Sequence, residues 1–517
     1  MEIRKKIKGL TEKAFLKEGI EVSSVKIEKP SRLEYGDYAA VPNISHEKKK
    51  INNLSILENI KKGKNFGKYF KKVESKGRFF NFFISEEYLK EGLKGILKEK
   101  RNFGKLDKGK GKKVQVEFIS ANPTGPLTIG NARGGPFGDV LGNVLRKAGF
   151  IVEKAYYVND YGNQIISLGH SVLKDEESQY KGDYIDLLNE RIEEKDPKEA
   201  GEKAAKIILE EMIKETVEKL GISYDEWFSE KRLHESGKIK EVLDSLEEKE
   251  LVYKKEGALW FRSEEFGDER DRVLIRKDGT PTYLAGDIAY HKYKFEEKNF
   301  DKVIDIWGAD HCGDVPGLKA GMDALEHKDK LDFVLLQFIT LFKNGKEVKM
   351  SKRKGVYITM DELLEEVGSD VVRFFFLQRS AGTHLKFDLS LAKEQSKKNP
   401  VYYVQYAHAR ICSVFDNEKK YSRSDLSLLT HSSEIGLIKK IIQFPEIIEE
   451  TANDFQLQRI PQYSIEVAEA FHKFYRDCKI ICEDEELKKA RLSLSLATKL
   501  ILKEILDLMG VSAPEKM

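Results

Sequence analysis

The fold is decided by a stretch that reads Val114-Gln115-Val116-Glu117-Phe118-Ile119 and, three residues later, Pro123-Thr124-Gly125-Pro126-Leu127-Thr128-Ile129-Gly130-Asn131. Apolar and polar side chains alternate in its first part, which predicts a β-strand. The prolines and glycines that follow predict a turn, and the pattern from Val140 to Lys147 predicts a helix. A strand, a turn and a helix in this order present backbone N–H groups at a helix start, where phosphate groups bind.

A second segment points to the same kind of ligand. About 220 residues further on, the chain reads Lys349-Met350-Ser351-Lys352-Arg353-Lys354-Gly355. Cations gathered before a glycine suit a mobile loop that stabilises the charge developing on a leaving pyrophosphate. Each segment alone is a modest signal. Their order, and a spacing that leaves room for a full nucleotide-binding fold, predict that both belong to one nucleotide site.

Strand-like and helical patterns alternate between the two segments. Apolar runs at Lys302–Trp307 and Phe333–Ile339 are separated by helical stretches, as in a parallel α/β sheet. We therefore predict a Rossmann-like domain over residues 106–384, with ligands beyond the carboxyl ends of its strands. The charged helical stretch Lys198–Leu220 indicates an insertion, which we place at about residues 165–270.

The flanking regions predict two further domains. Residues 1–105 combine a helical start with the aromatic, strand-like run Phe79–Ile84, which indicates a small α+β domain. From residue 385 to residue 517, apolar residues recur at helical spacing with few turn residues, which indicates an all-α helical bundle. Three domains agree with a length of 517 residues on the usual prior of about 150 residues per domain.

Composition limits the class of partner. The net charge of +3 arises from 90 basic and 87 acidic side chains, so a polyanion must meet a local basic patch.

The longest apolar run, Phe333–Phe342, is too short to cross a membrane, and Met1–Lys17 lacks the apolar core of a secretory signal. We expect a cytoplasmic protein without membrane contact. The four cysteines form no CxxC pair, which favours reduced structural thiols over a disulfide framework or a metal site.

Longer strings in the chain resemble one known family. Glu117-Phe118-Ile119-Ser120-Ala121-Asn122-Pro123-Thr124-Gly125-Pro126 is similar to the strand and signature loop of class I aminoacyl-tRNA synthetases, and within them of the arginyl-tRNA synthetases. The resemblance runs nearly from end to end, through Tyr156–Gln164, Asp278–Tyr290, Trp307–His311, Val401–Arg410 and Met509–Met517. It implies that residues 106–384 are a class I catalytic domain, that residues 1–105 contact tRNA, and that residues 385–517 bind the anticodon.

The resemblance implies an arginine–tRNA ligase. Such an enzyme activates L-arginine with ATP, carried with Mg²⁺, to arginyl-adenylate and transfers arginine to the 3′-terminal adenosine of tRNA(Arg). It also implies that tRNA must be bound before the adenylate forms. We expect a monomer with no tightly bound protein metal, because magnesium would bridge phosphate oxygens and need few protein ligands.

The resemblance also implies roles for particular residues. Arginine needs carboxylates that receive a planar guanidinium in bidentate fashion, and Asp287 is the strongest candidate. Without this resemblance, Asp287 would be interpreted as a helix N-cap and tyrosines at helical spacing as core residues. The implied sets are Thr128, Asn131, Lys349 and Lys352 for catalysis; Pro123, Gly125, Pro126, Thr128, Gly130, Asn131, Gly308, Asp310, Met350, Ser351 and Lys352 for ATP; Glu117, Asn122, Glu230, Tyr283, Asp287 and His311 for arginine; and Tyr35, Tyr402, Tyr406, His408, Arg410 and Met517 for tRNA.

The signature tetrapeptide departs from the family pattern. The usual sequence is His-Ile-Gly-His, whereas this chain has Thr128-Ile129-Gly130-Asn131. A threonine hydroxyl and an asparagine amide donate hydrogen bonds as imidazoles do, so we expect activity to survive, but neither carries a positive charge.

Pro136 is a second departure. The resemblance implies a helix that begins at Gly130, which would put this proline in the helix interior. Because proline is tolerated only in a first turn or at a kink, we predict a looser turn and then a regular helix from Pro136.

Other functions compete with this prediction. The missing histidines allow an RNA-binding relative that has lost catalysis, although the intact lysine segment and the complete C-terminal region argue against it. Cysteinyl-tRNA synthetases have a related anticodon domain, but they require zinc-binding cysteines that this chain lacks. The run Gly104–Gly111 nearly spells a phosphate-binding P-loop, but glycine stands where the magnesium-binding hydroxyl is needed.

Overall fold

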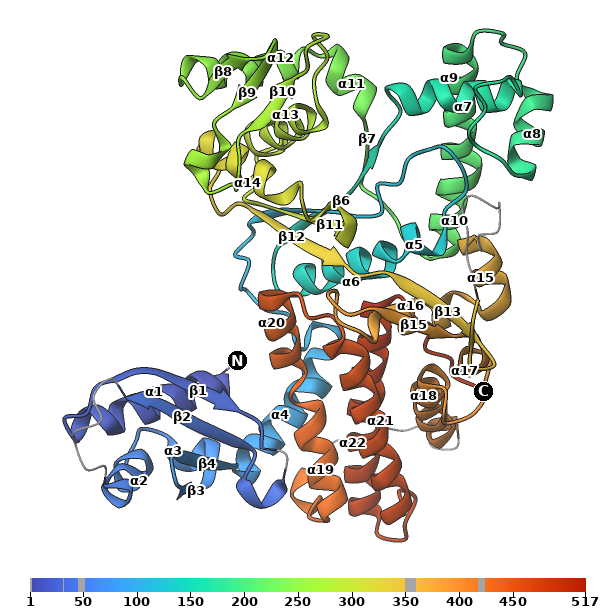
Figure 1. Cartoon of the computed structure of the whole chain (residues 1–517). Coiled ribbons are helices and arrows are strands. Elements are labelled where there is room, and N and C mark those ends of the chain that lie inside the picture. Colours follow the sequence, from blue (N-terminus) through green and yellow to red (C-terminus); the bar gives the residue numbers. More distant parts are fainter. Residues whose placement is uncertain (1, 31, 45–51, 349–358, 417–423) are drawn as a thin grey trace.

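The computed structural model describes residues 2–30, 32–44, 52–348, 359–416 and 424–517 (Figure 1). The molecule is built around a five-stranded parallel sheet in the order β12-β11-β5-β6-β7. Its strands are β5 (Lys113–Glu117), β6 (Ile151–Val158), β7 (Glu226–Ser229), β11 (Lys302–Gly308) and β12 (Leu331–Leu336). The strand order changes direction between β5 and β11, which creates a topological switch point. The predicted Rossmann-like sheet is confirmed.

The helix that follows β5 is broken in two. α5 (Ile129–Ala132) begins after Thr128, whose Oγ1 accepts a hydrogen bond from the backbone N–H of Asn131 at 3.3 Å. α6 (Gly134–Lys147) begins after Arg133 and holds Pro136 in its first turn, where the missing N–H would have had no helical partner. The regular helix therefore starts two residues before the predicted Pro136, and the looser turn expected ahead of it is the short α5.

Two added units lie between β6 and α13 (Tyr283–Glu296). The first is helical and contains α7 (Asn163–Leu173), α8 (Asp183–Arg191), α9 (Pro197–Ile208), a π-helical turn (Leu209–Ile213) and α10 (Lys214–Lys219). The second contains α11 (Glu230–Glu235), α12 (Lys238–Glu248) and an antiparallel sheet of β8 (Val252–Lys255), β9 (Ala258–Phe261) and β10 (Arg272–Ile275). β7 separates the units, so the single insertion expected at about 165–270 is divided by a strand too short to show a period-two pattern.

A second small sheet connects the parallel sheet to the bundle. It has the order β14-β13-β15 and consists of β13 (Ile339–Lys343), β14 (Lys346–Glu347) and β15 (Leu385–Asp388). α14 (Val315–Ala324) precedes β12, α15 (Met360–Val367) and α16 (Ser369–Leu377) lie between β14 and β15, and α17 (Leu389–Ala392) follows. Residues 385–388, where the bundle was expected to begin, instead pair with β13, a contact with distant residues that local sequence does not reveal.

The bundle itself begins at Pro400. Its helices are α18 (Pro400–Asp416), α19 (Ser432–Ile441), α20 (Phe444–Asp454), α21 (Arg459–Asp477) and α22 (Glu485–Met509). No helix in the described part of the chain is long and apolar enough to cross a membrane.

The N-terminal domain is an antiparallel sheet in the order β1-β2-β4-β3 with helices α1 (Glu2–Lys17), α2 (Asn53–Lys61) and α3 (Phe66–Tyr69). Its strands are β1 (Val22–Glu28), β2 (Tyr38–Ile44), β3 (Phe70–Lys76) and β4 (Phe79–Ile84), and α4 (Glu86–Glu99) leads out of it. The domain lies beside the bundle (Figure 1), where the Tyr38 hydroxyl donates to Glu446 at 2.8 Å and Lys439 pairs with Asp37 at 2.6 Å.

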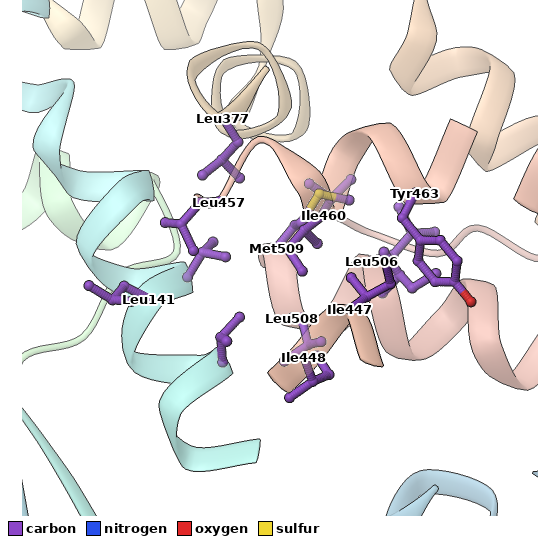
Figure 2. Close-up of a cluster of buried hydrophobic side chains, with 14 of the residues drawn as sticks. Leu141, Leu377, Ile447, Ile448, Leu457, Ile460, Tyr463, Leu506, Leu508 and Met509 are labelled. Carbon is purple, nitrogen blue, oxygen red and sulfur yellow. The ribbon is translucent and has the colours of Figure 1, made fainter. Parts of the chain in front are cut away.

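The helix after β5 shares a hydrophobic core with the bundle. Leu141 of α6 lies in one buried cluster with Ile448 of α20, Ile460 of α21 and Leu506 of α22 (Figure 2). α6 and the bundle therefore pack around one shared core.

A buried arginine joins the same elements by polar contacts. Arg373 of α16 is fully buried and donates to the carbonyl oxygens of Met509 at 2.6 Å and Leu220 at 2.8 Å, and to the Asp139 carboxylate on α6. Gly510 follows α22 with a φ of 63°, and a Cβ there would lie 2.3 Å from the Arg373 guanidinium. Only glycine satisfies both the backbone angle and this close approach.

Candidate functional site

A cleft of about 1850 Å³ opens at the carboxyl ends of the parallel strands, beside the switch point between β5 and β11. Its lining contains all but two of the predicted ATP-binding and arginine-binding residues that the structure describes. Those in the lining are Glu117, Asn122, Gly125, Pro126, Thr128, Gly130, Asn131, Tyr283, Asp287, Gly308, Asp310 and His311. Pro123 is buried, and Glu230 is buried close enough to Asp287 to raise its pKa. Two segments about 150 residues apart therefore face one space.

The chain leaves β5 through a strained turn. Ile119 has a φ of 65° and Ser120 a φ of 42°, a left-handed conformation that costs about 1–2 kcal/mol per residue and is rarest for β-branched side chains. The Ser120 hydroxyl accepts a hydrogen bond from the Tyr157 backbone N–H at 3.0 Å and donates to Glu117 at 3.3 Å. Strain of this kind concentrates at functional sites, and here it directs residues 121–128 along the cleft.

We call residues 118–131 the signature turn, and three tyrosine hydroxyls hold its backbone. Tyr224 donates to the carbonyl oxygen of Phe118 at 3.0 Å, Tyr156 to that of Ala121 at 2.9 Å, and Tyr184 to that of Thr124 at 3.0 Å. Burial raises the pKa of Tyr156 and of Tyr224, which keeps both hydroxyls protonated as donors. Tyr184 comes from α8, so the helical insertion supports the turn.

Thr128 and Asn131 stand where the family has histidines, and they bond to each other. The Thr128 hydroxyl donates to the Asn131 side-chain oxygen at 2.5 Å. The Asn131 amide N–H groups donate to no other residue that the structure describes, and Asn131 is exposed on the cleft. The amide is therefore free to donate to a bound phosphate.

Lys349, Met350, Ser351 and Lys352 lie outside the described residues, so their predicted roles stay predictions. The residues that follow this segment are attached to the signature turn. Thr359 forms a β-bridge with Thr128, and the Met360 N–H donates to the Leu127 carbonyl oxygen at 2.8 Å. The chain thus returns from the lysine-rich segment beside the turn with which it was predicted to share a site.

One carboxylate on the cleft floor has no compensating cation. Asp287 of α13 receives no side-chain hydrogen bond or ion pair from the described residues, and burial together with Asp305, Glu117 and Glu230 raises its pKa to about 8. One oxygen of the buried Glu230 also lacks a hydrogen-bond partner in the described part of the chain. A cation with several donors would stabilise the charged form of Asp287 and lower its pKa.

The neighbouring carboxylates are compensated. Lys294 is fully buried and donates to Glu117 at 2.9 Å and to Asp305 at 3.3 Å. His291 contacts Asp305 at 2.7 Å through Nε2 and donates from Nδ1 to the Asp287 carbonyl oxygen at 2.7 Å. Burial would raise the pKa of Asp305, but Lys294 and His291 hold it below its ordinary value. Among the described residues, Asp287 is therefore the floor carboxylate without a hydrogen-bonding or ion-pairing side chain, whereas Glu230 has His234 at 3.8 Å.

The rim of the cleft is exposed. Tyr283 begins α13 and is 72% exposed, Phe338 is 60% exposed, and Asn122, Asp310 and His311 are also accessible. Tyr283 is thus not a core residue, and it is placed to pack on a molecule that enters the cleft.

The predicted RNA-binding residues of the bundle separate into two groups. The rings of Tyr402 and Tyr406 are stacked with centroids 6.3 Å apart, and Arg410 donates to the Tyr406 hydroxyl at 2.6 Å. His408 is 1% exposed and donates from Nδ1 to the Pro514 carbonyl oxygen at 2.8 Å, so it holds the C-terminal tail against α18 and lies away from the surface.

The two remaining predicted RNA-binding residues lie at opposite ends of the chain. Met517 is 53% exposed at the end of the tail. Tyr35 is in the N-terminal domain, with the Lys76 ammonium 4.3 Å from its ring.

Sequence reasoning missed Tyr184, Lys294 and Arg133, all of which support the cleft. The partner of each in the signature turn or the cleft wall lies 60 to 250 residues away along the chain (Thr124 for Tyr184, Glu117 for Lys294, Phe338 and Thr383 for Arg133), and no local pattern marks these pairs.

Comparison with known proteins gives consistent matches along the whole chain. The family profile described as Arginyl tRNA synthetase N terminal domain matches residues 1–84, that of tRNA synthetases class I (R), catalytic domain, matches residues 170–374, and that of the DALR anticodon binding domain matches residues 404–517.

Individual relatives agree with these profiles. The arginine–tRNA ligase of Caldanaerobacter subterraneus subsp. tengcongensis is 44% identical over 529 residues, with 96% of this chain and 94% of the relative covered. That of Carboxydothermus hydrogenoformans is 42% identical over 524 residues, with 95% and 94% covered. The solved arginyl-tRNA synthetase of Thermus thermophilus superposes with a TM-score of 0.79 over 99% of this chain and 100% of that chain, at 20% identity, and supports the fold.

Proposed function

Because the chain belongs to the arginyl-tRNA synthetase family, we propose that it is an arginine–tRNA ligase that forms arginyl-adenylate from L-arginine and ATP and transfers arginine to the 3′-terminal adenosine of tRNA(Arg). The observation that carries this proposal is a single cleft in which the signature turn and the uncompensated Asp287 face the same space. Phosphate is an anion and suits the signature turn, whereas guanidinium is a cation and suits the Asp287 carboxylate.

Arginine binds at the floor. Asp287 receives the guanidinium, and Glu117 and Glu230 extend the anionic surface around it, while Tyr283 packs on the aliphatic part of the side chain. Asn122 and His311 are at the rim, where the α-amino and carboxylate groups would lie. A planar fork of five donors matches carboxylates better than the single ammonium of lysine, which supports selection of arginine.

ATP binds along the signature turn. Gly125 and Gly130 allow a close backbone approach, and the Asn131 amide donates to a phosphate. Gly308 and Asp310, at the end of β11, contact the nucleotide from the other side of the switch point. Magnesium travels with ATP and bridges its phosphate oxygens, and Lys349 and Lys352 stabilise the departing pyrophosphate. The reaction depends on position more than on acid–base groups.

RNA meets the two outer domains. Tyr402, Tyr406 and Arg410 present aromatic and cationic surface to an anticodon loop, with Met517 at the end of the tail, and Tyr35 contacts the tRNA from the N-terminal domain. We propose that the enzyme acts as a monomer in the cytoplasm.

The test is a charging assay with purified protein, ATP, Mg²⁺ and tRNA(Arg) across all amino acids, with citrulline, a neutral isostere of arginine, added as a competitor. We expect charging with arginine and negligible competition by citrulline, because citrulline offers Asp287 no positive charge. No charging at saturating substrates would refute the catalytic proposal. Retained tRNA binding in that case would favour the RNA-binding alternative.

A further inference from the structure

Arg133 is a buried cation that no carboxylate of the described residues neutralises. It lies at the break between α5 and α6, is 3% exposed, and burial lowers its pKa to about 10. Its guanidinium donates to the carbonyl oxygens of Phe338 at 3.2 Å and Thr383 at 3.0 Å. Within the described ranges its Nε has no hydrogen-bond partner and no acidic group lies at ion-pair distance. Such an arrangement contributes little stability, because desolvation of a charge outweighs bonds to two neutral acceptors.

The two carbonyl groups belong to the segments that enter β13 and β15. Phe338 is the residue before β13, and its carbonyl oxygen also accepts a hydrogen bond from the Leu385 N–H, the first residue of β15, at 3.0 Å. Thr383 lies two residues before β15. Arg133 therefore contacts the point where these two strands come together. β13 turns back through β14, and the lysine-rich segment begins directly after residue 348.

The other end of the same contact is the signature turn. Arg133 follows α5, two residues after Asn131 and five after Thr128. A shift of the guanidinium would move the α5–α6 break relative to β13, and with it the donors proposed for the phosphates. The backbone bridge between Thr128 and Thr359 ties the turn to the residues after the lysine-rich segment, whereas Arg133 ties it both to β13, before that segment, and to β15, after it.

We propose that Arg133 is a positioning residue for amino-acid activation, which holds the signature turn in register with the β13–β15 pair without touching a substrate. The inference rests on the proposed function. Its physical basis is the planar fork of the guanidinium, which reaches two carbonyl groups on different segments at once, as no other side chain of similar size does.

The experiment compares Arg133→Met and Arg133→Lys with the wild-type enzyme. Methionine keeps most of the volume and removes the charge and both hydrogen bonds, so the melting temperature should stay the same or rise. The kcat for tRNA-dependent pyrophosphate exchange should fall about 30-fold, while the KM for arginine changes less than about twofold, because the floor residues lie on β5, α11 and α13. Lysine reaches one carbonyl group and should restore part of kcat.

Thr383→Ala is the matched control. It alters the side chain at the same place and keeps the carbonyl group that Arg133 uses, so activity should equal that of the wild type. An unchanged kcat in Arg133→Met overturns the inference. A lowered kcat also overturns it if the melting temperature falls as well or if the KM for arginine rises. If Arg133→Met does not fold, Arg133→Lys decides: native stability with lowered kcat supports the inference, and native kcat overturns it. Absence of arginine charging by the wild-type enzyme would instead refute the proposed function and this inference with it.

Discussion

Arginine binding should be controlled by the protonation of Asp287. Burial and neighbouring carboxylates raise its pKa to about 8, so below that pH the free enzyme holds mainly the neutral acid. A guanidinium requires the carboxylate, because only the charged form accepts a bidentate pair. Raising the pH through 8 therefore strengthens binding, and the effect levels off above the pKa. The guanidinium itself stays charged throughout.

The magnitude follows from the pKa. If arginine binds only to the ionised form, its Kd rises tenfold for each pH unit well below 8, and about 25-fold between pH 8.5 and pH 6.5, which equals about 2 kcal/mol. At pH 7, binding should release about 0.9 proton per arginine, since a group with a pKa of about 8 is roughly nine-tenths protonated there.

Isothermal titration calorimetry measures both quantities. Titration of arginine in two buffers with different ionisation enthalpies gives the Kd and the number of protons released at each pH. Asp287→Asn should bind arginine about tenfold or more weakly at pH 8.5 and lose the pH dependence, with ATP binding near normal. Asp314 lies on the exposed rim of the cleft and adds to the raised pKa of Asp287, so Asp314→Asn should keep the pH dependence and move its midpoint to slightly lower pH. A Kd that is constant from pH 6.5 to pH 8.5, with no proton release, would refute the reasoning.

Three further predictions concern the nucleotide side, the buried cations and the bundle. Asn131→Ala should raise the KM for ATP about tenfold without changing arginine affinity, since it removes one donor to a charged phosphate; an unchanged KM in pyrophosphate exchange would exclude that contact. Lys294→Met should lower the free energy of unfolding by about 3–5 kcal/mol, because Glu117 loses its buried cation and Asp305 keeps only His291. The substitution removes a cation that holds the pKa of Asp305 below its ordinary value, so the loss should grow as pH rises and shrink as pH falls; urea unfolding at pH 5 and pH 8 tests this, and equal losses would contradict it. Gly510→Ala should cost about 1–3 kcal/mol of stability, as a Cβ at a φ of 63° would lie 2.3 Å from Arg373, and an unchanged thermal melt would show that the junction adapts.

Predictions drawn from short windows of the sequence agree with the structure. Alternating residues at 114–119 mark β5, the aromatic run at 79–84 marks β4, and apolar residues at helical spacing mark the bundle. These signals act over fewer than about ten residues, because side-chain periodicity and turn chemistry depend only on neighbours along the chain. The strings shared with the family extend this further, since they mark residues such as Asp287 that local physics alone would assign to a helix cap.

Elements whose boundaries depend on distant partners were placed less well. β7 is four residues long and is a strand only because β6 lies beside it, and β15 because β13 does. Pro136 marks the helix break in the sequence, but nothing nearby marks the hydrogen bonds of Arg133 at that break, whose carbonyl partners lie more than 200 residues away. His408 was expected to contact RNA, but it is buried and donates to the carbonyl oxygen of Pro514 in the C-terminal tail.

By itself the sequence determined which local elements form and which residues are candidates for the chemistry, because propensity, turns and motif residues are properties of neighbouring positions. Tertiary structure alone decided which charges are balanced. Glu117 and Asp287 read alike as acidic residues, yet Lys294 neutralises Glu117, whereas Asp287 has no cationic partner among the described residues. Electrostatic free energy depends on distance in space and on burial, and both arise only when segments far apart in the chain are brought together.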